Sequence, residues 1–233
     1  MRLLLLSNSR NPGGGWLDHA EGEIRDFLGA AARPLLFFPF AAVSMSFDAY
    51  TRMARKRFAK MGFELSGAHR ASTRALRSAG GIVAGGGNTF RLLHEMQKRG
   101  WLQRVAAEVR AGKPFVGWSA GANLACPTIR TTNDMPIIEP RSLRAMGLLP
   151  FQLNPHYTER SLTRHGGETR DQRIAEFLAL NPGVPVLGLC EGSLLRCESR
   201  RLELRLGAGA KLFLASKKAR KLKSGTDLSR MLK

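Results

Sequence analysis

Residues 114–125 read PFVGWSAGANLA, a short apolar run followed by a series of small residues. The run PFVGW (114–118) has the length and composition of a buried strand, and AGANLA (120–125) is typical of the start of a helix. Gly117 and Gly121 flank Ser119 in the pattern G-x-S-x-G, because bulkier residues would collide where a strand turns sharply into a helix. The stretch therefore predicts a strand, a tight turn and a helix, with Ser119 raised at the carboxyl end of the strand.

Outward from this stretch, short apolar runs alternate with helical patterns in both directions. The predicted strands are 3–7, 34–40, 63–69, 80–85, 114–118 and 184–190, and the predicted helices are 16–32, 47–60, 73–78, 89–98, 101–111 and 170–180. Such alternation predicts an α/β fold with a mostly parallel central sheet flanked by helices on both faces. The later runs LLRCES, RLELRL and KLFLA add a C-terminal β-meander to this prediction.

The length of 233 residues suits one large domain. We expect a single α/β domain over residues 1–215, followed by a basic C-terminal tail over 216–233 that contains the run KKARKLK. Residues 126–168 are rich in Pro, Asn and Thr, and they predict long loops around one short strand near Phe151. Loops of this length in a compact domain are usually functional or disordered.

The composition narrows the function classes. No apolar stretch approaches the roughly 20 residues of a membrane span, and the four leucines at 3–6 are too few for a secretory signal, so we expect a cytoplasmic protein. The three cysteines and five histidines have no metal-ligand spacing, which predicts free thiols and no metal site. The net charge of +19 raises non-specific affinity for nucleic acid, but the basic tail lacks interleaved aromatics. Specific nucleic-acid binding is not expected, and a homodimer is left open.

Ser119 is the predicted nucleophile, because the turn places its hydroxyl beside a helix amino end that favours a developing oxyanion. A serine requires a base to accept its proton. His156, in the segment NPHY at the end of a short strand, is the best placed of the five histidines.

Two carboxylates compete to orient the imidazole of His156. Glu191 directly follows the strand 184–190, which places it at the same sheet edge as Ser119. Asp134, in TTNDMPI, lies in the loop that follows the nucleophile helix. Placement favours Glu191, and the other carboxylate would orient substrate or cap a turn.

The segment GGGNT (85–89) follows a predicted strand and opens a helix. It lacks the Lys-Ser/Thr end of a P-loop and the spacing of a dinucleotide site. We interpret it as a loop of amide donors in which Gly86 and Gly87 complete an oxyanion hole with the amide of Ala120.

These segments together resemble the peptidase E family of aspartyl dipeptidases, whose fold is related to class I glutamine amidotransferases. The matching segments are 3–9, 85–93, 117–137, 154–158, 166–174 and the pair Glu191-Gly192. The resemblance implies hydrolysis of dipeptides with an N-terminal aspartate, a small acidic dipeptide as the partner, and no cofactor.

Carried over residue by residue, the resemblance implies Ser119 as nucleophile, His156 as base, and either Asp134 or Glu191 as the acid. Arg170, in GGETRDQRI, would bind the aspartyl side chain of the substrate, and Asn88 is assigned to substrate binding. Tyr157 departs from the family, where a phenylalanine is more usual.

Two other functions remain in competition with this one. The first is hydrolysis of other acidic or β-aspartyl peptides, and the second is a non-catalytic nucleic-acid-binding protein on the same scaffold. A cysteine-type amidotransferase is disfavoured because the turn carries a serine.

Overall fold

The computed structural model describes residues 1–29, 34–159 and 167–233 and contains two β-sheets. The first sheet has seven strands, in spatial order β3 (Leu65–Gly67), β2 (Leu35–Phe38), β4 (Gly81–Ala84), β5 (Phe115–Trp118), β1 (Leu3–Leu6), β8 (Leu194–Glu198) and β9 (Arg201–Arg205). Strands β3, β2, β4, β5 and β1 are parallel, whereas β8 and β9 are antiparallel. The large, mostly parallel sheet of the prediction is confirmed.

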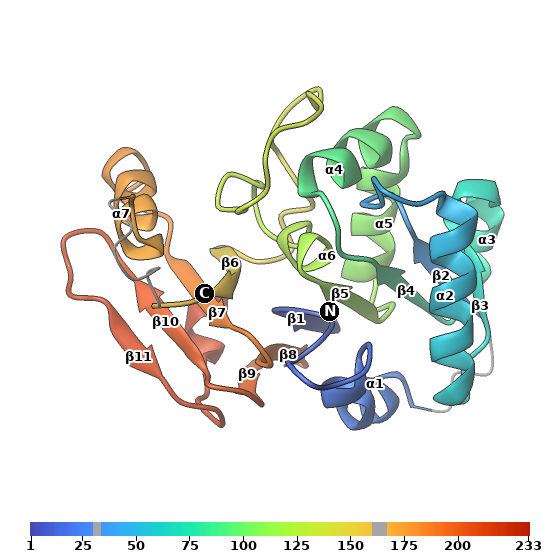
Figure 1. Cartoon of the computed structure of the whole chain (residues 1–233), viewed down its shortest axis with the longest axis horizontal. Helices are drawn as coiled ribbons and strands as arrows, with labels where there is room; N and C mark the ends of the chain where they lie inside the picture. The colour runs from blue at the N-terminus through green and yellow to red at the C-terminus, as the bar shows by residue number, and fades with distance from the viewer. Residues whose placement is uncertain (30–33, 160–166) are drawn as a thin grey trace.

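The second sheet has four strands, in spatial order β11 (Arg220–Leu222), β10 (Ala210–Phe213), β7 (Val186–Cys190) and β6 (Gln152–Tyr157). Strands β6 and β7 are parallel, and β10 and β11 are antiparallel to their neighbours. Figure 1 shows this sheet with its helix α7 (Arg170–Leu180) on the left, and the first sheet with its helices on the right.

The alternation of strand residues explains why helices cover both faces of the first sheet. In β1, Leu4 and Leu6 pack in one cluster with α1 (Glu21–Leu28) and α2 (Phe47–Lys60). Leu3 and Leu5 point to the opposite face. There they share a core with α3 (Thr73–Ser78), α4 (Thr89–Lys98), α5 (Trp101–Arg110) and α6 (Ala120–Asn123). The helices on the two faces thus bury a sheet that is apolar on both sides.

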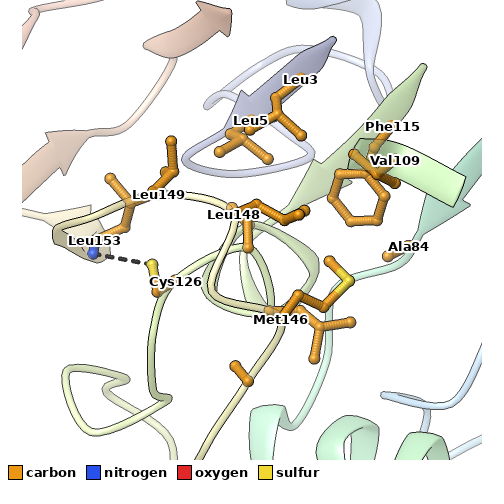
Figure 2. Close-up of a cluster of buried hydrophobic side chains, with 14 of the residues drawn as sticks. Leu3, Leu5, Ala84, Val109, Phe115, Cys126, Met146, Leu148, Leu149 and Leu153 are labelled. Carbon is orange, nitrogen blue, oxygen red and sulfur yellow. Dashed lines mark hydrogen bonds between the residues drawn. The ribbon is translucent and has the colours of Figure 1, made fainter. Parts of the chain in front are cut away.

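The core on the Leu3 side continues into the second sheet and joins the two sheets. Figure 2 shows Leu3 and Leu5 of the first sheet in the same cluster as Leu149, which lies in the long loop before β6, and Leu153 of β6. Residues 124–151 form no regular strand, yet their apolar side chains fill this core. Cys126 lies there as well, and its Sγ accepts a hydrogen bond of 3.2 Å from the Leu153 N–H.

Three sequence predictions need correction. The helix predicted over 16–32 begins later, as a 3-10 turn at Asp18–Ala20 followed by α1, and residues 30–32 lie outside the described residues. The predicted β-meander is divided, since β8 and β9 extend the first sheet while β10 pairs with β7 in the second. The strand that precedes Glu191 therefore belongs to a different sheet from β5.

The basic segment 216–233 is not a free arm. Its residues form β11 on the edge of the second sheet and a 3-10 turn at Ser229–Leu232. Leu222 and Leu228 are buried in the main core. The lysine and arginine side chains of this segment are exposed, and they lie at an ordered edge of the second sheet. No helix in the described parts of the chain is long and apolar enough to cross a membrane.

Candidate active site

Ser119 lies on the turn between β5 and α6, in a backbone conformation that few non-glycine residues adopt, with φ 52° and ψ −113°. A Cβ at Gly117 would collide with the carbonyl of Gly121, and a Cβ at Gly121 would collide with the carbonyl of Ala84. The glycines of the motif are thus required by close backbone approach. The Ser119 N–H is held by the carbonyl oxygen of Leu6 at 3.0 Å, which fixes the turn to β1.

His156 lies on an irregular part of β6 that turns its ring toward Ser119. The pairing register between β6 and β7 shifts between Asn154 and Tyr157, and His156 has a φ of 55°. Its backbone N–H donates to the Ser7 hydroxyl at 2.8 Å, which in turn donates to the Leu189 carbonyl at 2.8 Å. Ser7 is fully buried, so it fixes His156 to the end of β1.

Ser119, His156 and Glu191 form a continuous chain of hydrogen bonds. His156 Nε2 is 2.9 Å from Ser119 Oγ, and His156 Nδ1 is 2.9 Å from Glu191 Oε1. A carboxylate only accepts hydrogen bonds, so Nδ1 carries the proton and leaves Nε2 free to accept from the serine hydroxyl. This is the tautomer that a general base requires.

Asp134 has a different position. Its Oδ2 atom accepts from the N–H of Thr89 at 2.7 Å and from the Thr89 hydroxyl at 2.5 Å, at the amino end of α4. No hydrogen bond joins Asp134 to His156 in the part of the chain that the structure describes. Of the two competing carboxylates, Glu191 is the one that contacts the imidazole.

Gly86 and Gly87 line the same cavity as Ser119, and Ala120 directly follows Ser119 in the chain. A Cβ at Gly86 would lie 3.2 Å from the Cβ of Ser119, so this loop approaches the hydroxyl closely. Within residues 1–29, 34–159 and 167–233, the N–H groups of these three residues have no hydrogen-bond acceptor. Backbone N–H groups without an acceptor, near a nucleophile, are suited to a negative oxygen.

A cavity of about 510 Å³ opens over Ser119 and His156. Its polar lining residues include Asn88 and Asp134. Its apolar lining residues include Trp16, Val43, Met45 and Met53. Val43, Met45 and Met53 are 41% to 51% exposed, which is unusual for large apolar side chains. We call these three side chains the apolar wall of the cavity.

The comparisons with known proteins fit this arrangement. A family model described as Peptidase family S51 matches residues 3–205. The chain belongs to peptidase family S51. A relative in Nostoc sp. named peptidase E is 46% identical over 205 residues, which cover 87% of this chain and 85% of the relative. Another peptidase E, in Shewanella amazonensis, is 45% identical over 234 residues and matches 100% of this chain and 99% of its own.

Two solved structures share the fold of this S51 peptidase. A Listeria monocytogenes protein has a TM-score of 0.67 at 20% identity, with 88% of this chain and 98% of that chain covered. A peptidase from an acI-B1 actinobacterium has a TM-score of 0.66 at 15% identity, with 97% and 96% covered. The family model and the two relatives confirm the resemblance to the peptidase E family, and the two solved structures show the fold.

The two residues assigned to substrate binding are placed differently from each other. Asn88 lines the cavity, but its Oδ1 caps α4 by accepting from Arg91 N–H at 3.0 Å, and its Nδ2 donates to the Met135 carbonyl at 2.9 Å. Both polar ends of Asn88 thus have structural partners.

Arg170 does not line the cavity over Ser119. It lies in a neighbouring pocket of about 180 Å³, and Asp134 lines both spaces. Its Nη1 donates to Asn133 Oδ1, and no carboxylate in the described residues forms an ion pair with it. Burial, and secondly the charge of Arg173, lower the pKa of Arg170. Arg170 is thus a partly buried cation with no carboxylate partner among the described residues, in a pocket that shares Asp134 with the Ser119 cavity.

Sequence reasoning missed several residues that shape the site. Ser7 positions His156, and Asn8 positions the turn after Glu191 by accepting from Gly192 N–H at 2.7 Å. Tyr50 donates to the Gly86 carbonyl at 3.1 Å, and burial raises the pKa of its hydroxyl. A polar pair directly after the first strand was a usable signal for Ser7 and Asn8, whereas Tyr50 resembles any core residue of an amphipathic helix.

The Tyr157 hydroxyl, the one departure from the family near the base, points away from the serine. It donates to Asp171 Oδ1 at 2.6 Å and so links β6 to α7. Burial and the nearby Asp171 carboxylate raise the pKa of this phenol.

Proposed function

We propose that this S51 peptidase is a serine-type dipeptidase that hydrolyses Asp-Xaa dipeptides through an acyl-enzyme. The observation that carries the proposal is the hydrogen-bonded chain from Ser119 Oγ through His156 to Glu191, with 2.9 Å at each step. Nucleophile and base within hydrogen-bond reach, with the base oriented by a third group, are the requirements for an activated serine.

In the first half of the reaction, Ser119 Oγ attacks the substrate carbonyl while His156 Nε2 takes the hydroxyl proton. The carbonyl oxygen becomes negative and is stabilised by the N–H groups of Gly86, Gly87 and Ala120. His156 then gives its proton to the leaving amine, the peptide bond breaks, and an aspartyl ester forms on Ser119. In the second half, water attacks that ester while His156 takes a proton from the water. His156 then returns this proton to Ser119 Oγ as the ester bond breaks, and aspartate leaves.

Selection of aspartate is supported by Arg170. In the part of the chain that the structure describes, this guanidinium has no carboxylate partner, which favours a ligand that supplies one. Two of its N–H groups can bind both oxygens of a carboxylate. Asn133 already accepts from Arg170 and also receives the Asn154 side chain, so the guanidinium is held in place before substrate arrives. The family membership and the size of the cavity support a small peptide as the substrate.

The direct test is turnover of Asp-Leu beside Asn-Leu and Ala-Leu, together with labelling by a fluorophosphonate. We expect cleavage of Asp-Leu at a kcat/KM about 10²- to 10⁴-fold above that of Asn-Leu, and labelling that depends on Ser119. Labelling without Asp-Leu cleavage would leave a serine hydrolase of another specificity. The absence of both labelling and Asp-Leu cleavage would refute the proposed chemistry.

A further inference from the structure

The two carboxylate oxygens of Asp134 have unlike surroundings. Oδ2 is saturated by the N–H and hydroxyl of Thr89 and by the Thr132 hydroxyl at 3.2 Å. Oδ1 has no hydrogen-bond or ion-pair partner among residues 1–29, 34–159 and 167–233. One oxygen therefore fixes the carboxylate against α4, and the other remains available to a ligand.

Asp134, the residue that carries this available oxygen, lines the cavity over Ser119. Among the described residues that line this cavity, Asp134 is the one carboxylate, and there is no lysine or arginine. A positively charged group of a bound substrate would thus find its one charged partner at Asp134. A hydrogen bond between an ammonium and a carboxylate is stronger than one between neutral groups.

We propose that Asp134 binds the α-ammonium group of the substrate's N-terminal residue through Oδ1, and so restricts cleavage to peptides with a free amino end. This inference rests on the proposed function. In an N-terminal aspartate, the ammonium and the side-chain carboxylate are attached to adjacent carbon atoms. Asp134 lines both the Ser119 cavity and the Arg170 pocket, so the acceptor proposed for the ammonium belongs to a residue that borders both spaces.

The test compares two substrates that differ only in this group. Succinyl-Leu has the same acyl chain as Asp-Leu, with hydrogen in place of the ammonium. We expect Asp134→Asn to lower kcat/KM for Asp-Leu by about 10- to 100-fold and to change that for succinyl-Leu much less. Asparagine keeps an oxygen that can accept from Thr89, so the cap on α4 is preserved.

The pH profile supplies a readout that a purely structural role would not change. A peptide α-amino group loses its proton near pH 8, and the neutral amine then loses its attraction to Asp134. For the wild-type protein, kcat/KM for Asp-Leu should therefore fall as pH rises through that value, and the profile for succinyl-Leu should lack this fall. In Asp134→Asn the fall should become shallower.

A control variant separates the cap from the ligand contact. Thr132→Val removes a donor to Oδ2 and the acceptor of the Asp134 backbone N–H, but it takes no partner from Oδ1. It should therefore change kcat/KM for the two substrates by the same factor. Equal losses on both substrates in Asp134→Asn would overturn the inference. Equal cleavage of Asp-Leu and succinyl-Leu by the wild-type protein would overturn it without any variant, while the dipeptidase proposal would survive. If the wild-type protein cleaved neither Asp-Leu nor succinyl-Leu, the proposed function itself would be refuted.

Discussion

Glu191 Oε1 lies 2.9 Å from His156 Nδ1, and the contact follows from the pairing of β6 with β7. Tyr157 and Cys190 are opposed in this register, so the carboxyl ends of β6 and β7 lie side by side, and His156 reaches Glu191, the residue that follows β7. Glu191→Gln places an amide where only an acceptor suits the ring. We expect a loss of about 10²- to 10⁴-fold in kcat on Asp-Leu and on succinyl-Leu alike. A larger kcat effect from Asp134→Asn than from Glu191→Gln would return the role to Asp134.

Ser119→Ala and His156→Ala should each abolish nearly all turnover. Because the two groups act as a unit, each single variant should lose at least about 10⁴-fold, and the double variant should lose little more. Circular dichroism and thermal unfolding of each variant check that the fold is retained. If Ser119→Ala kept more than about a tenth of the wild-type rate, this serine would not be the nucleophile.

Ser7→Ala should lower kcat although Ser7 touches no substrate. The substitution leaves the His156 N–H and the Leu189 carbonyl without their buried partner, which costs about 1–3 kcal/mol of stability and releases the base from β1. Ser193→Ala is the matched control, because Ser193 is equally buried and its hydroxyl accepts from Gly209 N–H. Both variants should have a lower free energy of unfolding, but only Ser7→Ala should also have a markedly lower kcat under conditions where the protein is folded. Equal kinetic effects would contradict a positioning role for Ser7.

The apolar wall of the cavity predicts the preference at the second residue of the dipeptide. Val43, Met45 and Met53 would bury an apolar side chain, at about 0.8 kcal/mol per buried CH₂. Met53→Gln keeps the length but adds a polar end, so kcat/KM for Asp-Leu relative to Asp-Gly should fall about 3- to 10-fold. Leu180→Gln, at a side chain that is 87% exposed and outside the cavity, should leave the ratio unchanged.

Removal of the basic segment should unfold part of the second sheet. Truncation after residue 215 deletes β11 and the buried Leu222 and Leu228, so we expect a lower Tm and a loss of activity. Leu222→Ala alone should cost about 2 kcal/mol. Lys217→Ala, at an exposed position in the same segment, should change the free energy of unfolding by about 0.5 kcal/mol or less. A truncated protein with unchanged Tm would mean that the segment contributes nothing to the fold.

Local features of the site were predictable because each is encoded within a few consecutive residues. Gly117, Ser119 and Gly121 specify the turn by steric necessity, and the strand before Glu191 is a plain apolar run. The alternating elements of the first sheet were equally readable, since each strand is bounded by turn residues.

Features that depend on contacts between distant segments were not predictable. The division of the strands between two sheets depends on the packing of residues 124–151, which have no period of their own. The positive φ of His156 follows from an irregularity in β6 that no residue type demands. In the basic segment, frequent lysines obscured the isolated buried leucines, so an ordered edge strand resembled a solvated tail.

The nucleophile is carried by one sheet, and its base and acid are carried by the other. A shift of about 1 Å in a reacting group can lower the rate by two orders of magnitude. The turnover rate therefore depends on the relative position of the two sheets. The shared core around Leu153 and Leu149 is what maintains that alignment. In mild denaturant, partial separation of the two sheets at this shared core should abolish activity before the helices unfold. A cross-link between the two sheets should then preserve activity to a higher denaturant concentration than a cross-link within either sheet.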